Sequence, residues 1–590
     1  METKRTIIVK KRAKTGIDRF DEYIQKSGLE PKTYQREGVE FCLRRESAAA
    51  ASAASASGIT GGIIADEMGL GKTMMMMGLI LANLAAFKRT LIVVPVALVA
   101  QWVAQIKRTI IDTGVKSDLT VFVFHGATAK RRVVLEKPSK QNEGGDESPV
   151  WCHRPPKNAS TRAIDIVITT YGCVAMEEPA AVATAVAVKP KKKVAATAAA
   201  AVKKAPVLSL LTFRADRVIF DEAHHLRNKM SRVFKGAMKV VSVTGATRRP
   251  SVWIVTGTPI QNKISDLKSL CYILGFRMCD LISEEKRRQI RDEYVLRRTK
   301  VSVGMVAGVD AGGGDADADA DMACCAPRLQ SLAHYKSNVP WSSENECDLS
   351  REIHRKARDT TDRAERLKLY TRMRQMCVWP SLLTRAGDAG DAGGDDDDAR
   401  HGLSLDEFQI AVSKQSKMDR VVETMMAEAG KGRKSIVFCH FRREMTQLRD
   451  MLLRAGAGAV AGDVSIIDGS VTAKERGRIL AAEPTVLILQ IRTCSEGLNL
   501  QSYSDVYFVS PHWNPCVEDQ AIARCYRMGQ TSQVRVFRFY MSDFVAERSG
   551  AVDTVEEVDA VVAGECISTL DHKCEEIQER KRVLCNEFLM

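Results

Sequence analysis

The chain has 590 residues, a formal net charge of +14, and 45% hydrophobic residues. This length predicts roughly three to four structural units, and the ordinary apolar content is enough to give most of them a core. The positive charge favours an anionic partner, and both nucleic acid and an anionic membrane surface fit that requirement.

The sequence argues against a membrane-spanning, secreted or zinc-binding protein. Its longest apolar run, 74–87, is too short to span a bilayer and contains Asn83. The charged residues 1–12 lack the apolar stretch of a secretory signal. The sixteen cysteines are scattered without any Cys-x-x-Cys spacing, which predicts a reduced intracellular chain with no zinc site and no disulfide framework.

Four stretches of biased composition are predicted to be flexible surface insertions, because they can bury little apolar surface. They are the Ala/Ser-rich 47–58, the Ala/Lys-rich 177–206, and the Asp-rich 304–321 and 386–400. The basic clusters within 189–204 fit a nuclear import signal, a tether that touches DNA, or a solvated linker.

Short runs rich in β-branched residues alternate with helical patterns in the rest of the chain. Each run ends in a polar or Gly-rich turn, as buried strands of parallel sheets do. The runs are 63–65, 90–95, 164–169, 217–220 and 252–255, and then 435–438, 464–467, 486–489 and 506–509. Two series of strands predict the α/β class with two parallel sheets, and ligands of such sheets bind beyond the carboxyl ends of the strands.

The first motif lies between a predicted strand and an apolar helix. Residues 66–73 read Asp-Glu-Met-Gly-Leu-Gly-Lys-Thr, which is typical of a phosphate-binding loop. Gly69 and Gly71 allow backbone N–H groups to surround an anion at a helix N-terminus. Lys72 supplies a cation for the β- and γ-phosphates, and Thr73 supplies a hydroxyl for Mg²⁺.

An acidic pair follows the predicted strand 217–220, where Asp221 and Glu222 begin an Asp-Glu-Ala-His box. An aspartate at a strand end can hold Mg²⁺ through water, and the adjacent glutamate can orient and deprotonate the attacking water. Alone, this tetrapeptide would read as an exposed acidic turn, but the phosphate loop upstream favours a catalytic role. In that loop, Asp66 stands where the generic pattern has glycine.

The order and spelling of these motifs resemble the Swi/Snf family of superfamily-two helicase-like ATPases. Two segments have sequences typical of the family. They are 66–73, given above, and 256–262, which reads Thr-Gly-Thr-Pro-Ile-Gln-Asn. The resemblance covers about 29–540 and implies two RecA-like lobes in tandem, with helical insertions and low-complexity loops. It also implies ATP and Mg²⁺ as cofactors, in an active DNA-dependent ATPase.

The resemblance implies further contacts to nucleotide and DNA. Gln35 matches the family's adenine-side glutamine, and Asp66 belongs to the nucleotide-binding loop. The residues that match DNA-facing motifs are Pro95, Trp102, Thr170, Thr258 and Asn499. Backbone amides and hydroxyls at such positions hold phosphates and so position a duplex without reading its sequence.

The second half of the chain carries two arginines of interest. Arg524 and Arg527 are three residues apart, so we expect both on one face of a helix. From there the two guanidiniums can neutralise charge that develops on the γ-phosphate. The resemblance adds Gly497 and Gln520 to the nucleotide-binding set. Residues 493–496 read Thr-Cys-Ser-Glu where the family has more glycine, which implies a stiffer loop.

The resemblance also predicts the order of domains. The ranges are an N-terminal extension at 1–28, a first lobe at 29–300, a linker and helical subdomain at 301–415, a second lobe at 416–545, and a C-terminal helical tail at 546–590. Residues 296–300 read Leu-Arg-Arg-Thr-Lys and resemble a family segment that links the lobes. The tail fits either a packing helix or a site for a partner.

The function that the resemblance implies is ATP-dependent translocation on double-stranded DNA without obligatory strand separation. Such a motor would remodel or displace DNA-bound protein, including nucleosomes, either as a monomer or within a larger complex. It would act in the nucleus, or wherever DNA is handled, including a viral replication site. Two alternatives are a DNA-binding scaffold that has lost catalysis and an RNA-directed helicase. The intact Lys72, Asp221 and Glu222 argue against the scaffold, and the spelling of 520–530 argues against the RNA helicase.

Overall fold

The structure is a computed structural model that divides into two units, Met1–Val303 and Gly304–Phe588. The residues that it describes are 14–51, 59–116, 119–125, 133–135, 164–176, 210–242, 249–306, 329–384, 404–429, 431–456, 463–491, 498–544 and 567–589. The basic clusters at 189–204 lie outside these residues, as does most of each low-complexity stretch. None of the described helices is long and apolar enough to cross a membrane.

The first unit is built on a sheet that is parallel except at one edge. Its strand order is β4-β3-β5-β2-β6-β7-β1-β8, and β4 alone runs antiparallel to its neighbour. The strands are β1 (Gly61–Ile64), β2 (Thr90–Val94), β3 (Val121–Phe124), β4 (Val133–Leu135), β5 (Ile166–Thr170), β6 (Arg217–Asp221), β7 (Ser251–Val255) and β8 (Val295–Leu296). The five predicted strands are therefore confirmed. Because they run parallel, the motifs that follow them meet at one edge.

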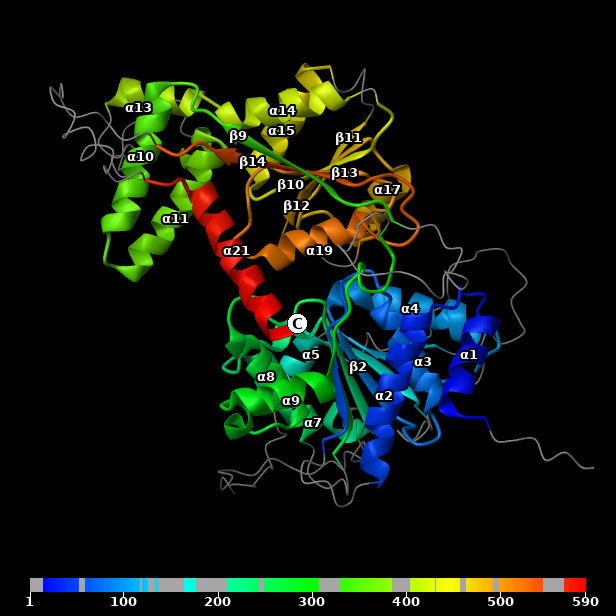
Figure 1. Ribbon diagram of the computed structural model, residues 1–590. Helices are drawn as coiled ribbons and strands as arrows, with labels where there is room; N and C mark the ends of the chain where they lie inside the picture. The colour runs from blue at the N-terminus through cyan, green and yellow to red at the C-terminus, as the bar shows by residue number, and fades with distance from the viewer. Residues whose placement is uncertain are drawn as a thin grey trace, which may run out of the picture. The chain divides into compact units, whose positions relative to one another are not determined.

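Helices cover both faces of this sheet (Figure 1). One face carries α1 (Gly16–Lys26), α2 (Thr33–Ala51), α3 (Lys72–Ala82) and α4 (Val99–Ile106), and the other carries α5 (Tyr171–Ala175), α7 (Arg232–Val241) and α8 (Ile264–Leu274). The short α6 (Leu210–Phe213) and the longer α9 (Glu284–Tyr294) belong to the same unit. Alternate strand residues such as Ile64, Ile92 and Ile168 pack under α1–α4. Phe20 and Tyr23 of α1 are part of this core, although 1–28 was predicted to be an extension, and α2 continues to Ala51 within the predicted insertion 47–58.

The second unit contains a wholly parallel sheet of order β11-β12-β10-β13-β14-β9. Its strands are β9 (Ala333–Val339), β10 (Ser435–Cys439), β11 (Val464–Ile467), β12 (Val486–Gln490), β13 (Asp505–Phe508) and β14 (Arg535–Met541). The four predicted strands of the second series are confirmed. The edge strand β9 comes from within 301–415, which was predicted to be a linker and a helical subdomain. It pairs with β14 along its whole length, from Ala333 opposite Arg535 to Val339 opposite Met541.

Helices also flank the second sheet. On one side lie α14 (Ser416–Glu428) and α15 (Arg442–Arg454), and on the other lie α17 (Ala473–Ala482) and α19 (Pro515–Cys525) (Figure 1). Three more helices, α10 (Glu344–Asp359), α11 (Arg363–Val378) and α13 (Leu405–Ser413), pack beside the sheet. Most charged residues of α15 and α17 face solvent, as expected of surface helices. The exception is Glu444 of α15, which is buried and accepts hydrogen bonds from the His440 and Phe441 backbone N–H groups.

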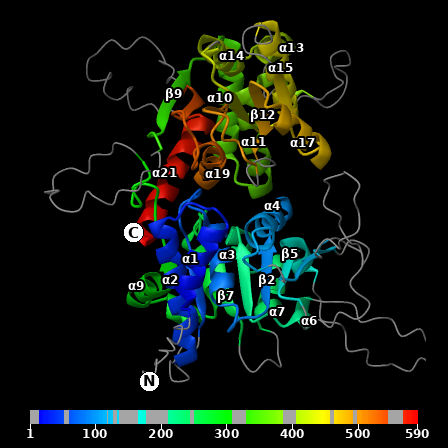
Figure 2. The ribbon, with the colours of Figure 1, turned by 90° about the vertical axis from the view of Figure 1, so that its right-hand side faces the viewer.

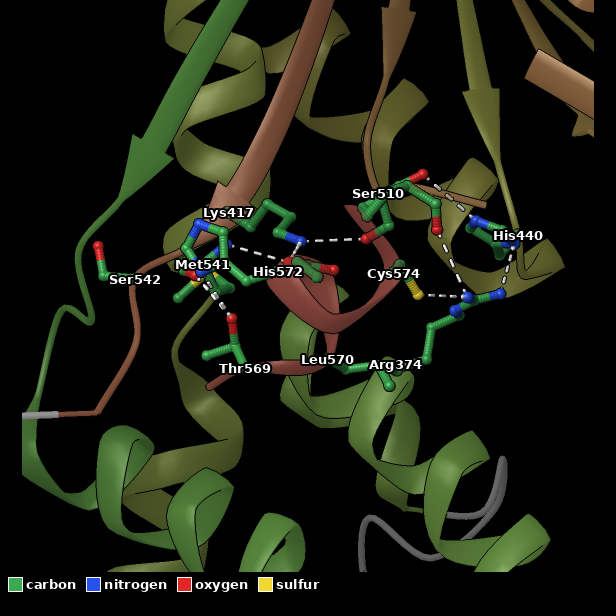
Figure 3. Close-up of polar contacts among 12 residues, drawn as sticks. Arg374, Lys417, His440, Ser510, Met541, Ser542, Thr569, Leu570, His572 and Cys574 are labelled. Atoms are coloured by element: carbon green, nitrogen blue, oxygen red, sulfur yellow. Dashed lines mark hydrogen bonds and ion pairs between the residues drawn. The ribbon is translucent and has the colours of Figure 1, made fainter. Parts of the chain in front are cut away.

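The C-terminal helix α21 (Leu570–Leu589) is packed into the second unit and runs beside α19 (Figure 2). A buried ion pair joins Lys417 of α14 to Asp571, and Asp571 also accepts a hydrogen bond from the Met541 backbone N–H at 3.0 Å (Figure 3). The Leu570 N–H donates to His354 Nε2 at 3.0 Å. Because Leu570 and Cys574 belong to the same core as the strands, this helix is an integral part of the unit.

Candidate nucleotide site

The loop between β1 and α3 has the geometry of an anion site. Gly69 and Gly71 have φ values of 92° and 79°, which favour glycine. A Cβ atom on Gly71 would lie 2.4 Å from Gln35 Nε2, so a larger residue would displace that amide in addition to straining the backbone. Gly71 is the N-cap of α3 and makes no side-chain cap, which leaves the first N–H groups of the helix directed at a ligand position.

Lys72 is held by the loop itself. Its Nζ atom donates to the backbone carbonyl oxygens of Asp66 at 2.8 Å and Glu67 at 3.2 Å. Burial lowers the pKa of Lys72, while the nearby carboxylates, Glu222 foremost, act to raise it. The ammonium group therefore lies among acceptors that phosphate oxygens can replace.

The acidic pair at the end of β6 is held by three donors. Trp102 Nε1 donates to Asp221 Oδ2 at 2.8 Å, and the Glu222 N–H donates to Asp221 Oδ1 at 3.0 Å. The Tyr171 hydroxyl donates to the Asp221 carbonyl oxygen at 2.6 Å. Glu222 has a φ of 49°, and its Oε2 lies 3.4 Å from His224 Nδ1.

The electrostatics of the pair fit a divalent cation. Burial, and then the charge of Glu222, raise the pKa of Asp221 to about 6. Two carboxylates that disfavour each other's ionisation are stabilised by a bound dication, and oxygen ligands are those that Mg²⁺ prefers. Asp221 and Thr73 therefore suit the predicted metal site, and their role stays a prediction.

Gln35 lies against the phosphate loop, where the prediction placed an adenine contact. Its side chain is buried and Nε2 donates to the Leu70 carbonyl oxygen at 3.2 Å. This contact joins α2 to the loop and orients the amide next to it. The contact with the base itself stays a prediction.

One of the predicted DNA contacts has a buried side chain. Trp102 is 1% exposed and its indole N–H donates to Asp221, so its contact with DNA stays a prediction. The aromatic residue positions the aspartate. Thr170 is also buried. Its Oγ1 donates a hydrogen bond to Cys173 Sγ and lies 3.3 Å from His125 Nδ1.

The other predicted DNA contacts differ in exposure. Pro95 and Thr258 are buried, and the Thr258 hydroxyl accepts a hydrogen bond from Gln261 Nε2 at 3.3 Å. Asn499 is exposed in the second unit, where its Oδ1 accepts from Arg527 Nη1 at 3.4 Å. Of these three, Asn499 therefore presents its side chain most directly to a partner.

The two arginines do not share a helix face, contrary to the prediction. Helix α19 ends at Cys525, because Tyr526 has a ψ of 77°, and Arg527 lies in the turn that follows. Gln530 stabilises this turn, since its Nε2 donates to the carbonyl oxygens of Gln501, Tyr503 and Cys525. Gly529, with a φ of 90°, lies in the same turn, beyond the end of the helix.

The two guanidiniums are nevertheless close enough to interact. Burial, and then the like charge of Arg524, lower the pKa of Arg527. Near them, Gln520 is 3% exposed and its Nε2 has no hydrogen-bond partner among the described residues. An anionic ligand bound here would pair with the two adjacent cations and accept a hydrogen bond from the unused Gln520 amide. The predicted Gly497 lies outside the described residues.

Two buried carboxylates organise the first unit. Glu46 was not predicted from the sequence, and Asp66 was predicted without its partner. Glu46 of α2 is bound on both oxygens by Arg217 and lies at the opposite edge of the sheet from the phosphate loop. Asp66 is bound by Arg298, which explains why the loop has an aspartate where the generic pattern has glycine. Neither partner can be found from sequence spacing, because each lies far along the chain.

Comparisons with known proteins match both units. A model of the SNF2-related domain matches residues 34–297, and a model of the helicase conserved C-terminal domain matches residues 416–529. Among solved structures, the Sulfolobus solfataricus SWI2/SNF2 ATPase core in complex with dsDNA is 18% identical, with a TM-score of 0.31, and covers 95% of this chain and 96% of that one.

Curated relatives extend over most of the chain. DNA repair protein RAD5 of Gibberella zeae is 24% identical over 89% of this chain and 56% of its own length. The Danio rerio protein called DNA excision repair protein ERCC-6-like is 25% identical over 88% of this chain and 35% of its own length. A probable global transactivator of Orgyia pseudotsugata multicapsid polyhedrosis virus is 24% identical over 86% of each chain. The chain thus spans 56% and 35% of the first two relatives.

Proposed function

Because the chain belongs to the Swi/Snf family of helicase-like ATPases, we propose that it is a DNA-dependent ATPase that moves along double-stranded DNA. The observation that carries the proposal is the meeting of three groups at one edge of the first sheet. They are the glycine-lined N-terminus of α3, Lys72, and the pair of the buried Asp221 and the partly buried Glu222.

The residues of this edge fit ATP with Mg²⁺. The N–H groups after Gly71 and the Lys72 ammonium bind phosphate oxygens, while Thr73 and Asp221 hold the metal ion. Mg²⁺, when bound, neutralises charge on the phosphates. Glu222 orients a water molecule and accepts its proton during attack on the γ-phosphate. Trp102 keeps Asp221 in place by its single hydrogen bond.

The second unit supplies the remaining groups in this proposal. Arg524 and Arg527 stabilise charge on the γ-phosphate in the transition state, and Gln520 offers its unused amide to the same ligand. We assign 29–300 and 416–545 to the two catalytic lobes. Gln35 is assigned to the adenine edge, where its position beside Leu70 supports the role.

Duplex DNA is the proposed track, and DNA-bound protein, including nucleosomes, is the proposed load. The net charge of +14 supports an electrostatic contribution to DNA binding. The names of the relatives refer to DNA repair and to transactivation, which supports a role wherever DNA is repaired or transcribed, in a nucleus or at a viral replication site. Asn499 is the proposed contact with the phosphate backbone that is best exposed.

The test is the steady-state ATPase rate with duplex DNA, single-stranded DNA and RNA over a range of salt concentrations. We expect duplex DNA to stimulate most, and the stimulation to fall steeply with salt because phosphate contacts dominate. Displacement of a third strand from a triplex should occur without separation of a duplex. Equal stimulation by RNA would refute the DNA assignment, and ATP binding without any hydrolysis would support the scaffold alternative.

A further inference from the structure

The segment that follows β8 lies along the start of the phosphate loop. The Ala65 N–H donates to the Leu296 carbonyl oxygen at 2.7 Å, and the Glu67 N–H donates to the Arg298 carbonyl oxygen at 2.8 Å. These bonds continue the pairing of β1 with β8 beyond the ends of both strands. Residues 296–300 therefore fix the backbone of the very residues whose carbonyl oxygens hold Lys72.

Arg298 connects three parts of the nucleotide site. Its Nε lies 3.2 Å from Asp66 Oδ1 and its Nη2 bonds Asp66 Oδ2, in a bidentate pair. Its Nη1 donates to the Tyr34 carbonyl oxygen, next to Gln35 in α2. A Cβ atom on Gly38 would lie 2.9 Å from Arg298 Nη2, so glycine at this position makes room for the guanidinium.

Two neighbouring cations extend the same contact. Arg297 Nη1 donates to the carbonyl oxygens of Ala65 at 2.6 Å and Gly257 at 3.0 Å. Lys300 Nζ lies 3.2 Å from Glu67 Oε1. The segment thus reaches the phosphate loop and the Thr256–Asn262 motif together, and Arg298 carries the contact with the buried carboxylate.

The charge of Asp66 matters because of where it lies. The carboxylate is fully buried, and the backbone carbonyl of the same residue binds Lys72 Nζ at 2.8 Å. An uncompensated carboxylate here would attract the Lys72 ammonium and repel the phosphates of ATP. Arg298 pairs with it in the bidentate geometry that guanidinium and carboxylate prefer.

We propose that Arg298 is a positioning residue for the phosphate loop, which neutralises Asp66 and thereby keeps Lys72 available to phosphate. This inference rests on the proposed function. Arg298 does not touch the nucleotide in this role. It acts through Asp66 on one side and through the Tyr34 carbonyl on the other, so it also fixes the helix of Gln35 against the loop.

The test is titration of the full chain with a fluorescent ATP analogue, beside single-turnover hydrolysis with duplex DNA. Arg298→Met should weaken nucleotide affinity by roughly tenfold or more, because it leaves Asp66 charged and unpaired. Asp66→Asn removes the charge but keeps an oxygen that can accept from Arg298, so it should lose far less nucleotide affinity than Arg298→Met. The double variant Asp66→Asn with Arg298→Met should regain most of the affinity. A purely structural clamp would instead lose comparable affinity from either single change.

Two further variants test whether a loss of affinity comes from the lost Arg298 contact. Arg298→Lys keeps the charge but not the bidentate geometry, so it should fold and show an intermediate affinity, which keeps the test decisive if Arg298→Met does not fold. Arg288→Ala changes an exposed arginine of α9 whose one ion pair among the described residues is with Glu284, and it should match the wild type. If both Arg298 variants bind nucleotide with wild-type affinity, or if the double variant recovers no affinity, the role of Arg298 is refuted while the proposed function is not. Absence of nucleotide binding by the wild type would overturn the proposed function with it.

Discussion

Removal of the Glu46 carboxylate should destabilise the first unit more than any exposed charge change. Both oxygens of Glu46 are fully buried and receive the Arg217 guanidinium, through Nε at 2.7 Å and Nη2 at 2.6 Å. Asn83, Trp253 and Ser251 donate to the same two oxygens at 2.7, 3.0 and 3.2 Å. One carboxylate thus joins α2, the end of α3, and the first residues of β6 and β7.

The magnitude follows from what Glu46→Ala leaves behind. Breaking a buried ion pair by removing one partner costs about 3–5 kcal/mol, because the other charge stays buried and unpaired. The Trp253 indole and the Asn83 amide would lose their acceptor as well, and an unsatisfied buried donor costs about 1–3 kcal/mol. These costs overlap, so we expect about 4–6 kcal/mol for the variant as a whole. Such a loss is comparable with the entire stability of a typical domain.

Urea unfolding of the full chain, followed by circular dichroism and intrinsic fluorescence, measures the effect. Glu46→Gln keeps the shape and part of the hydrogen bonding, so its loss should be smaller than that of Glu46→Ala. Glu22→Ala, which breaks an exposed pair with Lys14 and Lys26, is the matched control and should leave the first transition unchanged. A loss below about 1 kcal/mol for Glu46→Ala would refute the reasoning, because the pair would then contribute no more than a surface ion pair.

Three further outcomes are expected. Lys72→Ala should weaken nucleotide binding and abolish turnover, whereas Glu222→Gln should bind ATP normally and trap it unhydrolysed, as fluorescent-nucleotide titration and single-turnover assays would show. Arg527→Ala should bind nucleotide almost normally but lose on the order of a thousandfold in hydrolysis, and a wild-type rate would contradict its role. Burial lowers the pKa of His354 to about 3, so only the unfolded chain takes up a proton below about pH 6.5. His354 should therefore lower the free energy of unfolding by about 2 kcal/mol between pH 6.5 and 5. Urea unfolding should show this as a difference in pH dependence between the wild type and His354→Gln, but not between the wild type and the exposed His225→Gln.

The buried strands and the phosphate loop could be predicted because each is marked by residues that are close together in the sequence. A run of β-branched residues followed by a polar turn identifies a buried strand, and nine such runs are strands in the structure. The spelling of 66–73 predicted a loop before a helix, and Gly69 and Gly71 have the backbone conformation that it requires. Short strands such as β8 and the exposed edge strand β9 lack that apolar run and were missed.

The features that the sequence did not reveal share a physical cause, which is that tertiary contacts decide them. Trp102 was assigned to DNA, and its N–H donates to a carboxylate far along the chain. Arg527 was placed on a helix, which the Gln530 side chain helps to end two residues earlier. Glu46 carries no motif of its own, and the segment of Arg298 was interpreted only as a link between the lobes. Each became visible as a structural residue only through the burial of a partner that sequence spacing does not reveal.

The pairing of β9 with β14 sets limits on how the second unit can be made. A ribosome releases β9 before every other strand of its sheet, and its partner β14 emerges last, so the sheet cannot close until nearly the whole unit has been synthesised. Until then β9 has an unpaired edge and depends on its polar exposed residues, such as Lys336, to stay out of aggregates. A recombinant fragment cut at 416–529, the span of the C-terminal family model, would lack both strands and leave β13 as a bare apolar edge. Expression of the second unit alone should therefore begin before residue 329 and continue through α21.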